Sequence, residues 1–190
     1  MTADRKILKK MILNALSGKG AHVSVKDAAA GLDWKLSGVQ PEGVSHSIFQ
    51  LLNHMTYWNQ WAVNWLAGQK PSVPKHAQGG WPGRTAPQSA AEWREALRQF
   101  DRGLGTMTSA AEKADVLAKR GTKTPLEMLQ TIASHNSYHL GQVAVLRQGL
   151  CAWPPPSGGL TWQPNHKVSL DSRPGTECIC FVKNAAARKR

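Results

Sequence analysis

The chain is organised around a long helical pattern over residues 126–153. Its start is well marked, because Thr124 can cap the first turn, Pro125 suits the first helical position and Glu127 completes a T-x-x-E capping box. Residues at three- and four-residue steps then predict one buried face: Leu129, Ile132, Ala133, Asn136, Leu140, Val143 and Leu146. Three prolines at 154–156 forbid continuation. The fold must therefore bury one side of a long helix.

Two histidines, His135 and His139, lie inside this helix. Their spacing places them about 40° apart around the axis and roughly 6 Å apart along it, close enough to hold one ion. They lie beside Leu140 and Val143, where an imidazole without a partner is costly. For an H-x-x-x-H pair alone, the simpler interpretation is two partly buried histidines that cap the core.

A third histidine, His54, has a similar setting in a second helical pattern, expected over residues 45–66. One ligand from this helix and two from the last would make a three-nitrogen site, which suits zinc, nickel or iron with positions left open. His46, roughly 80° away around the same helix, is a poorer candidate and is expected at the surface or as an outer contact of the site. We therefore predict that His54, His135 and His139 bind a divalent metal ion.

Further amphipathic patterns over residues 4–17 and 90–108 bring the number of long helices to four. In the first of them the expected buried stripe is Leu8, Met11, Ile12, Ala15 and Leu16. A short helix is expected over residues 24–30 and a loop over residues 31–44. The absence of strand-like patterns, of a P-loop and of a Rossmann glycine motif leaves an all-α four-helix bundle, with its ligands projecting inward.

Residues 67–88 are rich in glycine and proline, which predicts a long irregular loop. Loops of this length are often functional, and this one is expected to lie over the mouth of the site, with Trp81 against the end of the bundle. A ladder of tryptophans follows His54, at positions 58, 61 and 65. It indicates core packing for at least two of them, or an aromatic wall that leads to His54.

The chain has 190 residues and a net charge of +12, which can attract nucleic acid or acidic ligands. Because the cations are spread along the chain, we expect no specific nucleic-acid partner, although a nucleic-acid-binding module remains an alternative. No apolar run is long enough for a membrane span, so no membrane partner is expected. Three cysteines, an odd number, argue against a disulfide framework and fit a cytoplasmic protein.

Two regions are expected from these patterns. Residues 1–163 carry the bundle, and residues 164–190 form a basic tail with Cys178 and Cys180. The apolar positions of the tail show no helical stripe, so it has little apolar area to offset its ordering entropy. We expect a flexible tail that neither the fold nor the metal site requires, and a chain truncated after Gln163 should keep its metal content and melt within a few degrees of the full chain.

Four segments together resemble the DinB/YfiT-like superfamily of proposed metalloenzymes. They are GAHVSVKDAAAGL (20–32), HSIFQLLNHMTYWNQWAV (46–63), S-x-x-E-W (89–93) and HNSYHLGQVAVLRQGLCAWPPPSGG (135–159). The last is the most specific, and the resemblance covers about residues 5–162. It implies a four-helix bundle with one histidine ligand on the second helix and two on the last, which fall on His54, His135 and His139. Characterised relatives include transferases and isomerases that depend on bacillithiol, mycothiol or glutathione, which implies a low-molecular-weight thiol cosubstrate.

A dication held by three neutral imidazoles keeps its charge, so it can acidify a bound water or bind a thiolate. No carboxylate neighbours His54 or the 135–139 block, so a hydrolase of the H-E-x-x-H kind would lack its base. We therefore expect a thiol-dependent S-transferase acting on a small molecule, with a hydrolase or a non-catalytic stress-response metal protein as alternatives. Tyr138 and Gln142 are candidates to orient a ligand, although an ordinary hydrogen bond explains either equally well. The assembly state is open, and a homodimer is one option.

Overall fold

The computed structural model describes residues 2–159. Six α-helices and one short 3₁₀ helix occur in this range: α1 (Ala3–Ser17), α2 (Val25–Ala29), α3 (Trp34–Ser37), α4 (Ile48–Leu66), η1 (Ala77–Gly80), α5 (Ala90–Lys113) and α6 (Pro125–Gly149). None of the described residues belongs to a β-strand, apart from a single bridge between Arg120 and Lys123. The all-α prediction is therefore confirmed.

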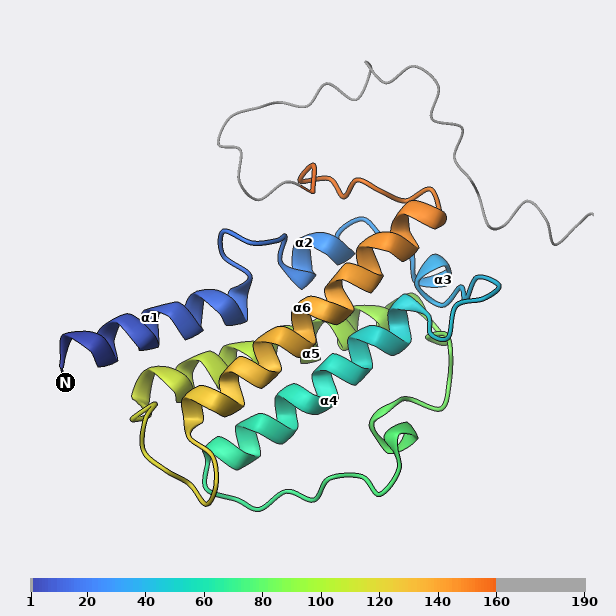
Figure 1. Ribbon diagram of the computed structural model, residues 1–190. Helices are drawn as coiled ribbons and strands as arrows, with labels where there is room; N and C mark the ends of the chain where they lie inside the picture. The colour runs from blue at the N-terminus through green and yellow to red at the C-terminus, as the bar shows by residue number, and fades with distance from the viewer. Residues whose placement is uncertain (1, 160–190) are drawn as a thin grey trace, which may run out of the picture.

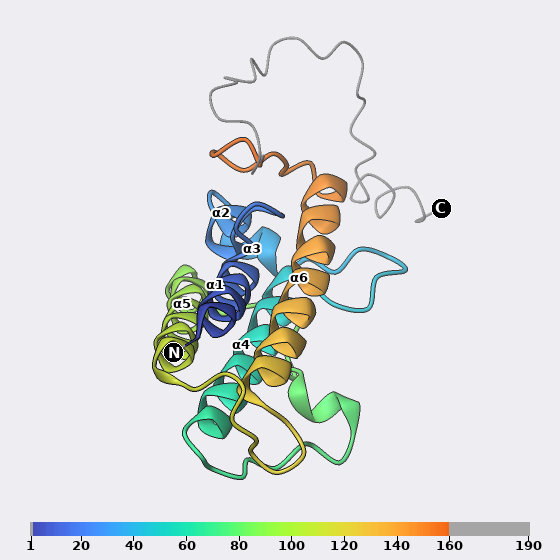
Figure 2. The ribbon, with the colours of Figure 1, turned by 60° about the vertical axis from the view of Figure 1, so that its left-hand side comes forward.

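The four long helices surround a common interior (Figures 1 and 2). Each contacts two others, because α4 packs on α5 and α6, and α1 packs on the other sides of α5 and α6. The short helices cover one end, with α2 against α6 and α3 against α5. This arrangement places α4 and α6, the two helices that carry the predicted ligands, side by side.

Local sequence signals account for the ends of these two helices. Thr124 and Glu127 form the expected capping box of α6, and Ser47 and Gln50 form another at the start of α4. The Ser47 hydroxyl also donates to the Thr85 carbonyl and so links α4 to the loop that follows it. α6 ends at Gly149, four residues earlier than predicted, because the chain then turns through Cys151 with φ 56°.

The expectation of a continuous loop over residues 31–44 was wrong. Asp33 accepts hydrogen bonds from the backbone N–H groups of Lys35 and Leu36, at 2.8 and 3.4 Å, and so caps the one-turn helix α3. The glycines and the proline of this segment indicated a loop, and a helix of one turn is too short to show an apolar period.

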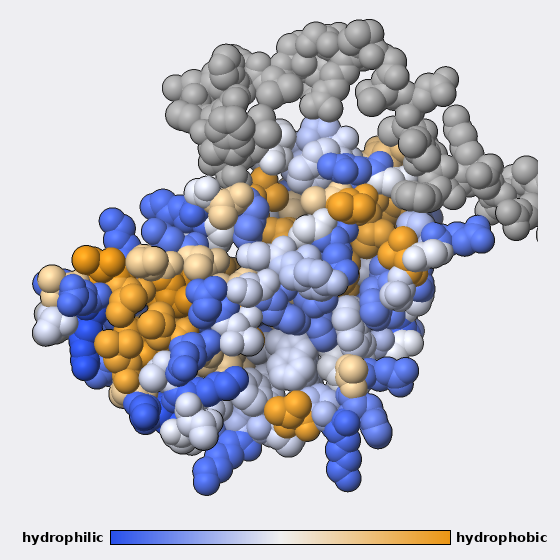
Figure 3. Space-filling model, in the orientation of Figure 1, coloured by the Kyte–Doolittle hydropathy of each residue, from blue (hydrophilic) through white to orange (hydrophobic). Residues whose placement is uncertain are grey.

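The buried face of α1 also differs from its prediction. Ile12 and Leu16 are buried, but Met11 is 62% exposed and Ile7 is 56% exposed. Figure 3 shows apolar side chains gathered where α1 lies in Figure 1. The contacts of α1 with α5 and α6 leave this side of the helix uncovered, which its sequence period alone does not reveal.

The core consists of two apolar clusters, one toward each end of the bundle. Along α4, Met55 belongs to the first cluster and Ala62 to the second, while along α6 Leu140 belongs to the first and Ala133 to the second. The tryptophans at 58, 61 and 65 are partly buried against the second cluster, as expected for core packing. A polar layer separates the clusters, in which the side-chain amide of Asn136 donates to that of Asn59 at 2.9 Å. The three candidate histidines lie close to this polar layer in the sequence, with His54 on α4 and His135 and His139 on α6.

The cysteine prediction needs a correction. The odd number of cysteines argued against a disulfide framework, but Cys151 is disulfide-bonded. The predictions for residues 164–190, including Cys178 and Cys180, lie outside the described residues. Among helices of the described part, none is both long enough and apolar enough to cross a membrane.

Candidate metal centre

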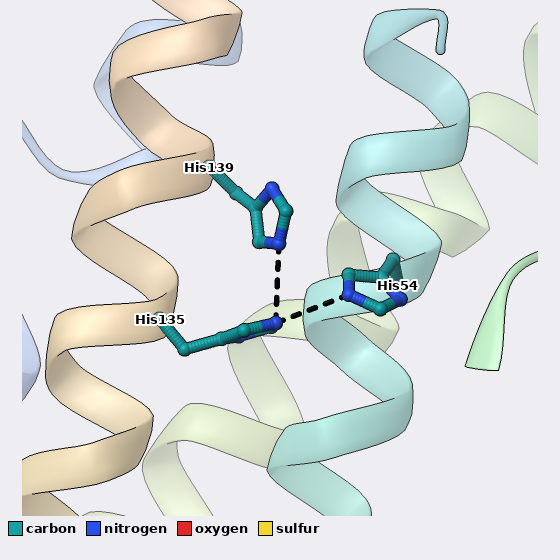
Figure 4. A group of neighbouring side chains, drawn as sticks. All are labelled: His54, His135 and His139. Atoms are coloured by element: carbon teal, nitrogen blue, oxygen red, sulfur yellow. Dashed lines mark hydrogen bonds between the residues drawn. The ribbon is translucent and has the colours of Figure 1, made fainter. Parts of the chain in front are cut away.

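His54 of α4 meets His135 and His139 of α6 between the two helices (Figure 4). The Nε2 atom of His135 lies 3.1 Å from the Nε2 atom of His54 and 3.1 Å from that of His139. One nitrogen from each ring lies within 4.8 Å of the other two. The structure thus brings together the three histidines that sequence spacing singled out, and their nitrogens are close enough to share one ion.

The other nitrogen of each ring faces an oxygen atom. His54 Nδ1 lies 2.7 Å from the Gly80 carbonyl, His139 Nδ1 lies 2.7 Å from Gln142 Oε1, and His135 Nδ1 lies 3.4 Å from Asn136 Oδ1. Because these oxygens only accept hydrogen bonds, they favour rings that carry their hydrogen on Nδ1 and leave a lone pair on Nε2. Three lone pairs therefore point into the same small space, which is the donor set that a cation needs.

Burial keeps these rings neutral. Desolvation, followed by repulsion from His139 and His54, lowers the pKa of His135 from its ordinary 6.5 to about 4. Desolvation is also the largest cause that lowers the pKa of His54 and of His139. At neutral pH all three side chains are therefore in the unprotonated form that binds metals.

We predict that the metal-free protein loses stability as the pH falls from about 6.5 toward 4. In that window the unfolded chain takes up a proton on residue 135, whereas the folded chain, with its pKa of about 4, does not. Above the window both states are neutral there, and below it both are protonated. Denaturant unfolding of chelator-treated protein across this range measures the slope, which should be shallower in His135→Ala. An unfolding free energy that does not change with pH in the unmodified protein would contradict the lowered pKa of His135.

Trp81, from the loop after α4, fixes the orientation of His54. Its ring stacks on His54 with centroids 3.7 Å apart and planes 5° apart, and on His46 at 3.6 Å and 10°. Two imidazoles cannot stand over the same ring face at this separation, so His46 and His54 lie on opposite faces of Trp81. The loop thus lies over the site as expected, and Trp81 packs against the apolar cluster at one end of the bundle as well as on the two histidines.

The helical angle used to place His46 does not apply, since this residue precedes α4 rather than lying on it. It is half-buried and reaches the site through Trp81, as an outer contact. Trp58 meets His54 and His135 edge-on, with centroids 6.4 Å away in each case. Sequence reasoning missed the roles of Gly80 and Trp81, although the G-G-W-P-G run inside a long loop was a signal for a specific structure there.

The two candidate orienting residues have different surroundings. Gln142 accepts from the His139 ring and donates to the Tyr138 hydroxyl at 3.4 Å. Tyr138 is 65% exposed, and its ring meets His139 at 5.0 Å between centroids. Gln142 therefore orients His139, a candidate metal ligand, while Tyr138 lies exposed beside it.

Replacing Gln142 with leucine should weaken metal binding by about 10- to 100-fold, because the His139 ring loses the acceptor that holds its hydrogen on Nδ1. Competition with a chelating dye would measure the affinity. Gln148→Leu, at an exposed position of the same helix, is the matched control and should bind as the unmodified protein does. Equal affinities in all three proteins would show that Gln142 has no orienting role.

A cavity of about 470 Å³ lies close to the site, and two of its lining residues, Gln142 and His46, contact His139 and Trp81. The loop before α4, the first turn of α4 and the second half of α6 line it, through Gly43, Val44, Ser45, His46, Leu51, Tyr138, Gly141, Gln142, Val145 and Leu146. The cavity therefore has room for a small molecule, and Gln142 and the His46–Trp81 pair stand between it and the three histidines.

Comparison with known protein families gives one match. The model of the DinB superfamily matches residues 26–143, which is well over half of the chain and includes all three histidines. No curated protein and no solved structure matches. The helical fold and the resemblance of the sequence segments agree with this match. The chain belongs to the DinB superfamily.

Proposed function

We propose that His54, His135 and His139 bind one divalent cation, either zinc, nickel or iron, and that the protein is a metal-dependent transferase that uses a low-molecular-weight thiol. The observation that supports this most strongly is the approach of three Nε2 atoms whose rings each direct Nδ1 at an oxygen. Superfamily membership adds to it, since the superfamily is metal-binding.

The surroundings of the three rings favour thiol chemistry over hydrolysis. A bound cation would supply a Lewis acid that stabilises a thiolate at neutral pH. The three ring partners are a peptide carbonyl and two amide oxygens, so they provide no carboxylate to act as the base of a hydrolase. Glu127 is engaged in the capping box at the start of α6.

In the proposed reaction the thiolate sulfur attacks an electrophilic carbon of the second substrate. A C–S bond forms, the bond to the leaving group breaks, and the leaving group departs with that electron pair, while the thiol proton passes to solvent. The protein's part is to hold the reactants in place. Gly80 and Trp81 fix the His54 ring, and Gln142 fixes the His139 ring.

The test is turnover by protein purified without a histidine tag. Glutathione, mycothiol, bacillithiol and cysteine are each supplied with monochlorobimane, which becomes fluorescent on S-alkylation. We expect turnover above the uncatalysed rate with at least one thiol, its loss after chelation and its return on adding metal. Turnover that chelation leaves unchanged would refute metal dependence. Hydrolysis of an activated ester without thiol would favour the hydrolase, and stoichiometric metal without any turnover would favour a non-catalytic metal protein.

A further inference from the structure

The cavity beside the histidines is not lined by them, but it is joined to them at two points. Gln142 lines the cavity and also accepts a hydrogen bond from the His139 ring. His46 lines it and stacks on Trp81, whose other face stacks on His54. A molecule held in the cavity would therefore be separated from His139 by Gln142, and from His54 by His46 and Trp81.

The chemistry of this cavity is unlike that of the protein surface. None of its ten lining residues is Asp, Glu, Lys or Arg, although the chain carries a net charge of +12. A second cavity of about 470 Å³, between the α2–α3 segment and α5, makes the contrast clear, since its lining includes Lys26, Arg94 and Asp101. The walls of the first cavity are aliphatic and aromatic, and their polar groups are the hydroxyls of Ser45 and Tyr138, the amide of Gln142 and the imidazole of His46.

We propose that this cavity binds the electrophilic substrate, and that this substrate is an uncharged, largely apolar molecule. The assignment rests on the proposed transferase function. A carboxylate held against this lining would be partly desolvated, and no cation in the lining would offset that cost. A thiol such as glutathione, which carries carboxylates, therefore does not fit this wall, whereas an apolar body with one or two hydrogen-bonding groups does. Tyr138 and Gln142 are placed to contact such groups.

Gly141 offers a way to fill the cavity without disturbing the helix. It lines the cavity from α6, and a Cβ added there would meet no atom within 4 Å. Leucine is also a better helix former than glycine, so Gly141→Leu should fold at least as well as the unmodified chain. The matched control is Gly105→Leu, at an exposed position of α5 that is equally open and lies outside this cavity.

The experiment is equilibrium dialysis of metal-free protein with two unreactive neutral probes, dimethylbimane and 2-methoxynaphthalene, and with the carboxylated counterparts carboxymethyl-bimane and 2-naphthoxyacetate. We expect at least one neutral probe to bind at least about tenfold more tightly than its counterpart. Gly141→Leu should lose that binding by a similar factor, and Gly105→Leu should retain it. Adding metal should change the affinity by less than about twofold, because the probes lack a reactive group.

Three results would overturn the assignment: no binding of either neutral probe, equal or tighter binding of the carboxylated ones, or undiminished binding by Gly141→Leu. Turnover then separates this inference from the proposed function. If the probes bind as expected but no thiol is alkylated, the cavity is a site for an uncharged apolar molecule, while the transferase proposal and the role of that molecule as its electrophile fail. If turnover occurs while Gly141→Leu leaves KM for monochlorobimane unchanged, the electrophile binds elsewhere.

Discussion

Replacing His135 with alanine is expected to reduce bound metal from about one ion per chain to a trace. Its Nε2 atom is the one that lies 3.1 Å from the Nε2 atoms of both His54 and His139, so its loss leaves only two donors. Removing a residue that merely supports a ligand weakens metal binding by 10- to 100-fold, so removing a ligand should weaken it by more than about 100-fold. Elemental analysis of gel-filtered, untagged protein measures the stoichiometry.

His76→Ala is the control for this variant, since His76 is an exposed histidine of the loop between α4 and α5. It should bind one ion per chain, as the unmodified protein does. His135→Ala should keep its helical circular dichroism, which would separate the loss of a ligand from a loss of fold. Retention of a full equivalent of metal by a folded His135→Ala would place the metal at another set of residues.

Arg147→Met is expected to destabilise the fold by about 2–4 kcal/mol and to lower the melting temperature by about 10 °C. Arg147 is only 3% exposed, and its guanidinium donates to the carbonyls of Ala28, Ala30 and Ala152. It therefore ties the end of α2 to the turn that follows α6. Methionine fills a similar volume but donates no hydrogen bond, so these carbonyls would lose their charged partner.

Arg102→Met is the comparison, because the side chain of Arg102 is 66% exposed and forms a surface ion pair with Glu95. Such pairs contribute little, so the change in unfolding free energy should stay within about 0.5 kcal/mol. Denaturant unfolding of both variants at the same pH gives the two values. Equal midpoints for Arg147→Met and the unmodified protein would show that the buried guanidinium does not hold α2 in place.

The parts of the fold that were predictable have local causes. Thr124, Pro125 and Glu127 specify the start of α6 by contacts among themselves, and the apolar period specifies its buried face. The spacing of His135 and His139 follows from helix geometry alone, which is why their proximity could be predicted from the sequence. His54 required the further inference that two helices lie side by side, to which the family resemblance contributed.

The parts that were missed depend on contacts between distant segments. Nothing local to Trp81 indicates that it stacks between His46 and His54, or that the Gly80 carbonyl accepts from His54. Met11 has the right period for burial, but the neighbours of α1 leave it exposed. Arg147 was not singled out from the sequence, although it is buried and donates hydrogen bonds to three carbonyls.

Three imidazoles are proposed to bind one metal ion. X-ray absorption at the metal edge, on untagged protein in the absence of added thiol, counts these ligands. It should show three imidazole nitrogens at about 2.0–2.1 Å from the metal, with remaining positions occupied by light atoms. Fewer than three imidazoles, or a sulfur ligand at about 2.3 Å, would contradict the assignment to His54, His135 and His139.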